Sequence, residues 1–170
     1  MAVSRPLSSD EIYNMMNGQI KILTYPQLAS ISSLDELLEP FDKVIFLYNH
    51  TSHQGHWCAI TRHDGVVTFF DPYGEMDGSD LMPDKELSWI SKKERENLGI
   101  RAPYLTQLLL QHDGPIEYNE MPLQSQNDGV NDCGRWCMAW VSNSDLPLEA
   151  FQRVTMDMPN RDEFISEAYS

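Results

Sequence analysis

The sequence has few cysteines and no long apolar run, and both absences limit what the protein can be. Three cysteines in 170 residues are too few, and odd in number, for a disulfide framework, which indicates a reducing, intracellular setting. No apolar stretch is long enough to cross a membrane, and residues 1–6 lack the apolar core of a secretory signal. We therefore expect an intracellular protein without a membrane partner.

Basic residues are scarce as well. The chain has 12 Lys and Arg residues against 26 Asp and Glu residues, which gives a net charge of −14. This charge repels the phosphates of duplex DNA, so strong DNA binding is not expected. The acidic residues do not form an Asp-x-Asp-x-Asp-Gly calcium loop, and we expect neither a metal ion nor another cofactor.

The remaining composition is that of a globular protein, and its length predicts a single domain over residues 1–170. Two helix starts are indicated by the capping-box spacing of Ser8 with Glu11 and of Ser33 with Glu36. The apolar runs that follow predict strands at 43–48, 56–62 and 66–71, the last two joined by an Asp-Gly hairpin turn. Later segments predict a short strand at 116–118 and helices at 84–98, 103–111, from 133, at 147–154 and from about 160. Strands segregated from helices in this way predict an α+β fold.

The stretch around Cys133 carries the strongest chemical signal. Asp132 is predicted to cap a helix whose apolar side includes Trp136, and Cys133 then stands at the helix N-terminus. Backbone N–H groups and the helix dipole favour a thiolate there, and the thiolate is the nucleophilic form. Gly134 has no Cβ and would let a substrate approach the backbone. A lone cysteine at such a place is more often a packed core residue, so the other residues decide.

A cysteine nucleophile needs a base, a group that orients the base, and an oxyanion hole. His56 begins one strand of the predicted hairpin and Asp71 ends the other, so the two side chains are expected to lie close together. Gln126 precedes Cys133 by seven residues and has amide donors for an oxyanion. Each of these residues has an ordinary structural explanation by itself, but their joint presence points to nucleophilic catalysis.

These motifs resemble the adenain and ubiquitin-like-protein (SUMO) protease superfamily of cysteine proteases. The residues that carry the resemblance lie between Val44 and Trp140, namely His56-Trp57, Phe70-Asp71-Pro72-Tyr73-Gly74, Gln126 and Asp132-Cys133-Gly134. The Asp-Pro-aromatic-Gly turn and the glutamine spacing are similar to adenain, which has Glu in place of Asp71. The Asp-Cys-Gly triplet and the aspartate are similar to SUMO proteases, whose glutamine usually lies one residue nearer the cysteine. Because this spacing is not rigidly diagnostic, Gln124 is a second candidate for the oxyanion hole.

The resemblance implies a fold and an activity. The expected fold is a central mixed, mostly antiparallel sheet packed between helices, with the nucleophile at the N-terminus of a buried helix. The expected reaction is hydrolysis of peptide or isopeptide bonds at glycine-rich sites through a Cys133-His56-Asp71 triad. Trp57 and Gly134 would bind the substrate in a narrow cleft.

Two kinds of protein substrate fit this resemblance, viral precursor proteins and a ubiquitin-like modifier. We favour a viral maturation protease, because the sequence lacks the long regulatory extension common on cellular deconjugases. Such a protease is expected in the host cytoplasm or nucleus, with packaging in the virion as a further location. The need for a short activating peptide stays open.

Three other interpretations compete with this one. A viral chymotrypsin-like protease also has the order His, acid, Cys, but a strand follows its nucleophile, whereas helical spacing follows Cys133. A non-catalytic recognition domain with the same fold would not need the full set of catalytic candidates. A zinc-binding module would draw its ligands from His50, His53, His56, Cys58 and Cys137, whose spacing matches no standard zinc motif.

Overall fold

The computed structural model describes residues 7–49, 55–72, 74, 92–119, 123 and 132–169. The strands of these parts are β1 (Lys21–Thr24), β2 (Lys43–Asn49), β3 (Gly55–His63), β4 (Val66–Phe70) and β5 (Ile116–Tyr118). The helices are α1 (Ser9–Met15), the 3-10 helix η1 (Tyr25–Ser30), α2 (Leu34–Leu38), α3 (Lys92–Leu98), α4 (Tyr104–Leu109), α5 (Cys133–Ser142), α6 (Leu148–Met156) and α7 (Arg161–Ala168).

The described strands form one mixed sheet in the order β1-β2-β3-β4-β5. The three middle strands are antiparallel neighbours, and β1 and β5 join the edges in parallel to β2 and β4. The β3–β4 turn places Asp64 at φ 50° and Gly65 at φ 78°, which is the left-handed conformation that a two-residue hairpin turn requires. The hairpin predicted from Asp-Gly is therefore confirmed.

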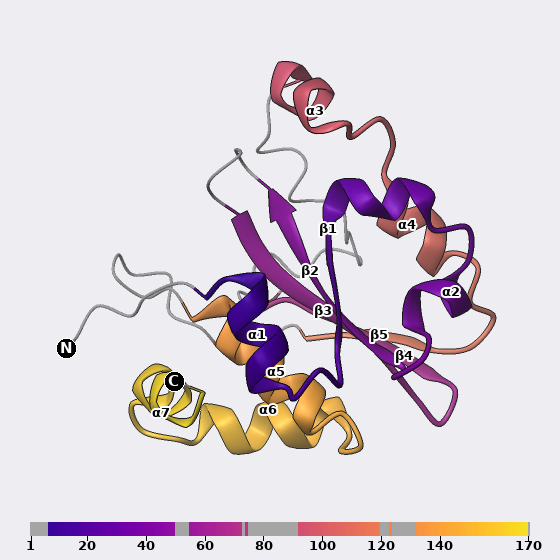
Figure 1. The fold of residues 1–170 in the computed structure, drawn as a ribbon. Helices are drawn as coiled ribbons and strands as arrows, with labels where there is room; N and C mark the ends of the chain where they lie inside the picture. Colours follow the sequence, from indigo (N-terminus) through magenta and orange to yellow (C-terminus); the bar gives the residue numbers. More distant parts are fainter. Residues whose placement is uncertain are drawn as a thin grey trace.

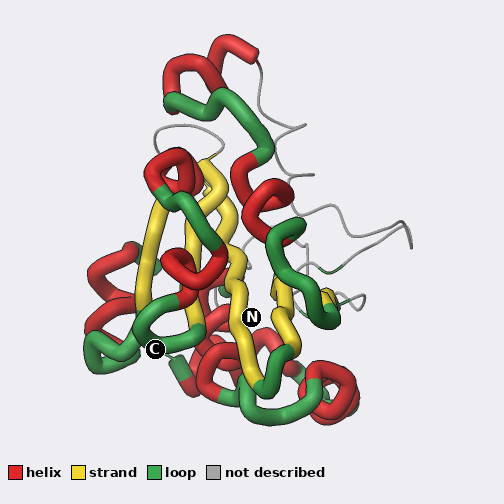
Figure 2. The backbone as a smooth tube through the Cα atoms, turned by 90° about the vertical axis from the view of Figure 1, so that its right-hand side faces the viewer, coloured by secondary structure: helices red, strands yellow, loops and turns green. Residues whose placement is uncertain are grey.

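Helices cover both faces of the sheet (Figures 1 and 2). On one face, Phe46 and Ile60 pack with residues of η1, α2 and α4. On the other face, Ile45 and Ala59 pack with residues of α1, α5, α6 and α7. Because β2 is covered on both sides, its residues 44–46 are all buried and read as a continuous apolar run.

The α+β class, the mixed sheet between helices and the buried helix that begins at Cys133 are confirmed. The capping box predicted for Ser8 and Glu11 is present, with Ser8 Oγ accepting a hydrogen bond from Glu11 N at 3.2 Å. In the second predicted box Ser33 Oγ accepts from Glu36 N at 3.1 Å, but the Glu36 carboxylate bonds Ser32 in place of Ser33. The helix predicted at 84–98 is described only from Lys92 onward. No described helix combines the length and the apolar character that a membrane span needs.

Candidate active site

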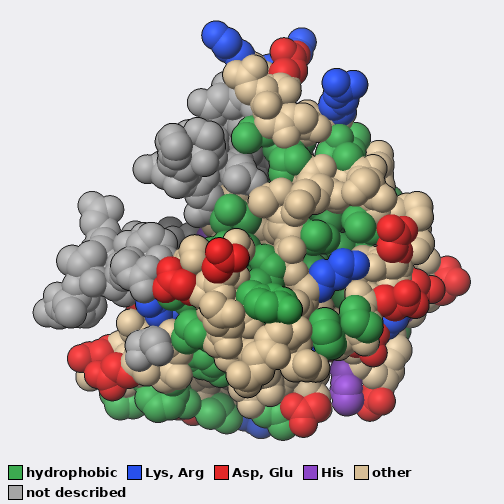
Figure 3. Space-filling model, viewed as in Figure 1, with side chains coloured by type: hydrophobic (Ala, Val, Ile, Leu, Met, Phe, Trp, Pro, Cys, Tyr) green, Lys and Arg blue, Asp and Glu red, His purple; other side chains and the backbone are tan. Residues whose placement is uncertain are grey.

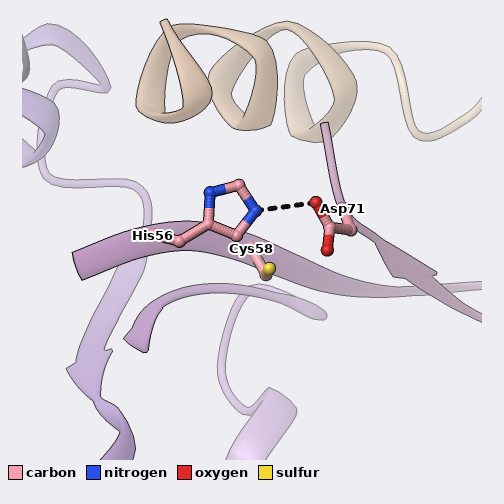
Figure 4. Close-up of side chains that lie close together, drawn as sticks. All are labelled: His56, Cys58 and Asp71. Carbon is pink, nitrogen blue, oxygen red and sulfur yellow. Dashed lines mark hydrogen bonds and ion pairs between the residues drawn. The ribbon is translucent and has the colours of Figure 1, made fainter. Parts of the chain in front are cut away.

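The β3–β4 hairpin brings His56 and Asp71 into direct contact. His56 faces Tyr48 in the β2–β3 register, and Asp71 directly follows Phe70, the last residue of β4. His56 Nε2 lies 2.7 Å from Asp71 Oδ1, and the close-up shows this nitrogen turned toward the carboxylate (Figure 4). The hairpin argument from the sequence predicted this proximity.

The surroundings of His56 favour its protonated form. Burial alone would lower the pKa of His56, but the charge of Asp71 opposes burial and the net effect raises this pKa well above its usual value of 6.5. The Cys58 side chain and hydrogen bonds with Asp71 and Cys133 raise the pKa of His56 further. Cys133 therefore lies close enough to the His56 ring to affect its protonation. An imidazolium beside a thiol stabilises the thiolate.

Cys133 is the first residue of α5 and is half-buried, whereas residues 134–141 behind it are buried. The helix packs against β3, and Trp140 Nε1 donates a hydrogen bond to Thr61 Oγ1 at 3.1 Å. This packing holds the start of α5 at the end of the sheet where His56 lies. The structure therefore brings together three of the four predicted catalytic residues.

The predicted capping role of Asp132 is wrong. Asp132 occupies the N-cap position of α5, but its φ and ψ of −105° and 13° differ from the extended conformation that capping requires, and its side chain makes no cap hydrogen bond. The carboxylate instead accepts a hydrogen bond from Arg135 Nη1 at 3.1 Å, and both side chains are buried. Arg135 was not among the residues singled out from the sequence.

Asn119 is a second residue that the sequence did not reveal. Its side chain accepts a hydrogen bond from Asp71 N at 2.9 Å and donates one to Asp71 O at 2.6 Å. Asn119 is buried and directly follows β5, the strand that pairs in parallel with β4. The amide therefore continues the backbone pairing by one residue and fixes the main chain of Asp71. An asparagine after a short strand is too weak a local signal to predict this contact.

Trp57 and Gly134 have a packing role in this structure. Trp57 is 6% exposed, and its indole N–H donates to Leu7 O at 3.2 Å. A Cβ on Gly134 would lie 3.1 Å from Ile12 Cδ1 and 3.2 Å from Trp57 Cδ1. The glycine thus allows α1, α5 and β3 to approach closely. That either residue also binds substrate stays a prediction.

The site offers one possible set of metal ligands among the described residues. Ligand atoms of His56, Cys58 and Asp71 lie within 4.8 Å of one another, and the Cys58 sulfur is drawn below the ring in Figure 4. One nitrogen, one sulfur and one oxygen ligand would suit zinc. The hydrogen bond between His56 and Asp71 also accounts for their proximity without an ion, so the absence of a metal cofactor stays a prediction.

Several predicted site residues lie outside the described part of the chain. They are Gln124 and Gln126, proposed for the oxyanion hole, and His50 and His53, weighed as zinc ligands. Cys58 and Cys137 are described and are buried, as expected for core residues. Burial raises the pKa of the Cys137 thiol well above its usual value of 9.0, so this cysteine is a packing residue and a poor nucleophile.

Comparison with known proteins gives one sequence relative and several solved structures. The chain is 31% identical over 153 residues to the "Uncharacterized protein V9" of Sputnik virophage, a match that spans 89% of this chain and 84% of that protein. No protein-family model matches the chain.

Similar solved structures include SUMO protease Ulp1 with its catalytic cysteine oxidized to a sulfonic acid. This structure is 15% identical, with a TM-score of 0.47, over 97% of this chain and 75% of that one. ChlaDub1 from Chlamydia trachomatis is 13% identical, with a TM-score of 0.42, over 94% of this chain and 97% of that one.

Proposed function

This chain belongs to the family of the Sputnik virophage protein V9, and we propose that it is a cysteine protease with Cys133 as the nucleophile. One observation carries the proposal: the buried ring of His56 hydrogen-bonds Asp71 at 2.7 Å, and Cys133, which helps to raise the pKa of that ring, begins a helix. This is the arrangement of nucleophile, base and orienting acid that thiol hydrolysis needs.

The reaction follows from these roles. The Cys133 thiolate attacks the scissile carbonyl carbon, and the C–N bond breaks as His56 gives its proton to the leaving amine. The resulting thioester is hydrolysed by water, whose proton passes to His56; the C–S bond breaks, the carboxylic acid is released, and the thiolate–imidazolium pair is regenerated. Asp71 keeps the imidazole oriented and stabilises its charged form. The backbone N–H of Cys133 and the side chain of Gln126, or of Gln124, would stabilise the oxyanion.

The substrate we favour is a viral structural precursor protein cleaved at glycine-rich sites. The virophage relative supports a viral role, which would place the enzyme in the host cytoplasm or nucleus, or inside the virion. Glycine-rich sequences suit a narrow approach beside Trp57 and Gly134. A deconjugase for a ubiquitin-like modifier is the second candidate, favoured by Asp71 and by the triplet that runs from Asp132 to Gly134, which are similar to SUMO proteases.

Covalent capture tests the proposed nucleophile. A probe that ends in Gly-Gly and an electrophile should label Cys133 in the wild-type protein and spare the buried Cys58 and Cys137. Mass spectrometry of the digested adduct identifies the labelled residue, and Cys133→Ala serves as the control. Labelling that persists in Cys133→Ala would contradict the proposal. Probes built on a peptide and on ubiquitin-like proteins separate the two substrate classes by their labelling rates.

The metal-binding alternative has its own test. Zinc bound at one equivalent to the purified protein, retained in Cys133→Ala and lost in Cys58→Ser, would favour a zinc module over a protease. Elemental analysis of the three proteins makes the comparison.

A further inference from the structure

The C-terminal helix α7 and the residue that follows it make hydrogen bonds both to Leu123 and to α5, the helix that begins at Cys133. One contact is made by Arg161, the first residue of α7, whose Nε donates a hydrogen bond to Leu123 O at 2.7 Å. Leu123 is fully buried, and its own N–H donates to Pro72 O at 3.0 Å. Pro72 directly follows Asp71. The backbone of one buried residue therefore links α7 to the end of the strand that carries the acid.

A second set of contacts joins α7 to the helix that carries the nucleophile. Trp136 Nε1 donates to Asp162 Oδ1 at 3.2 Å, and Arg135 Nε donates to Tyr169 O at 3.2 Å. Arg135 also holds Asp132, the residue that precedes Cys133, through their buried ion pair. The first turn of α5 is thus hydrogen-bonded to α7 near its start, at Asp162, and to Tyr169, the residue that directly follows α7.

These two sets of contacts meet on one short helix. Arg161 hydrogen-bonds Leu123, whose own N–H bonds the residue after Asp71. Its neighbour Asp162 accepts a hydrogen bond from Trp136 of α5. The position of α7 therefore constrains how far the end of β4 lies from the start of α5. A displacement of reacting groups by about 1 Å lowers a rate about 100-fold, so small movements of this helix would matter.

We propose that α7 is part of the scaffold of the active site and that Arg161 is a positioning residue that acts through Leu123. This inference rests on the proposed protease function. Without the guanidinium, the carbonyl of buried Leu123 would lose this hydrogen bond, and losing a buried hydrogen bond destabilises the backbone position that it holds. That movement would displace Pro72 and the adjoining Asp71 relative to Cys133.

The test compares Arg161→Met with Arg161→Lys. For Arg161→Met we expect kcat on a Gly-Gly peptide substrate to fall between about tenfold and 100-fold, with KM nearly unchanged, because chemistry is disturbed and binding is not. Arg161→Lys keeps an N–H donor and should recover part of kcat. The matched control is Arg153→Met on α6, since Arg153 is a helical arginine whose side chain is 68% exposed and pairs with Glu149 at 4.0 Å. This control should keep the wild-type kcat.

A substrate-independent readout separates this inference from the proposed function. The rate of alkylation of Cys133 by iodoacetamide, measured against pH on folded protein, reports the thiolate stabilised by His56. A wild-type Cys133 no more reactive than a free thiol would overturn the proposed function. The wild-type protein can instead be reactive while Arg161→Met keeps both the wild-type kcat and the wild-type alkylation profile. That result would overturn the role of α7 and leave the proposed function standing. Circular dichroism and the thermal midpoint confirm that each variant is folded.

Discussion

The His56 environment holds a proton more tightly than an ordinary histidine does. Burial is the largest single influence and lowers the pKa of His56, but Asp71, Cys58 and Cys133 together outweigh it and raise this pKa well above its usual value. The protonated ring therefore persists above the usual range, and it is lost as pH rises through the raised pKa. The stability that the pair gives the folded state has the same sign: it is complete below about pH 6.5, the unfolded value, and declines above it.

Replacing Asp71 by Asn should reveal this effect in the kinetics. The neutral amide no longer raises the pKa of His56, so burial lowers it and the alkaline limb of the kcat/KM profile moves to lower pH. We expect kcat/KM at pH 7 to fall by about 10²- to 10⁴-fold, the usual contribution of general acid–base catalysis. The measurement is a pH profile of both proteins on one peptide substrate. An unchanged alkaline limb would show that Asp71 does not set the protonation of His56.

Residues that act through distant partners were beyond the reach of the sequence. His56 and Asp71 were predicted to meet because a hairpin turn of known geometry separates them. Asn119 contacts Asp71 through the arrangement of the whole fold, and no local pattern marks it. Arg135 follows Asp132 by three residues, so this pair has a local spacing that was not used. Asp132 is a residue type preferred at helix N-caps, but its carboxylate forms an ion pair with the buried guanidinium of Arg135, three residues later. A charged partner within one turn outweighed the local preference.

Elements that a few neighbouring residues mark were predicted from the sequence. Pairings and contacts that depend on packing between distant segments were not. The cap of α1 and the β3–β4 hairpin have local signals in a few neighbouring residues. The parallel pairing of β5 with β4 does not, because it depends on the segments against which β5 packs. The close approach of α1 to α5 belongs to the same class, since it depends on a glycine whose missing Cβ faces Ile12.

Filling the space at Gly134 should destabilise this contact. A Cβ there would lie 3.1 Å from Ile12 Cδ1, and overpacking of this kind costs about 1–3 kcal/mol of unfolding free energy. Gly134→Ala should therefore lower the midpoint of urea unfolding. The substitution Ile12→Val removes the clashing Cδ1, so Gly134→Ala should cost less in that background. Equal costs in both backgrounds would show that the Ile12 contact is not the source of the strain.

The whole molecule carries far more acidic than basic side chains. With a net charge of −14, acidic groups dominate, and the space-filling view shows acidic side chains over several parts of one face (Figure 3). Basic side chains stand out on that face at α3, which contains Lys92, Lys93 and Arg95. Such a surface repels polyanions and would draw basic segments of a substrate toward it.

This charge predicts the response to nucleic acid. Duplex DNA added at physiological salt should leave the protease rate unchanged, because the net charge of −14 repels its phosphates. The rate on a peptide substrate with and without DNA, at two salt concentrations, makes the measurement. A rate increase that disappears at high salt would reveal a basic DNA-binding surface and contradict the prediction.

The order of the groups along the chain affects when a newly made molecule becomes reactive. A ribosome makes the β3–β4 hairpin first, then α5 with its sulfur, and α7 after both. Until α7 has emerged, Arg135 lacks Tyr169 and Leu123 lacks Arg161, so the sulfur and the imidazole are not yet held in register. If α7 positions the active site as proposed, a polypeptide still attached to the ribosome would react more slowly than the completed protein.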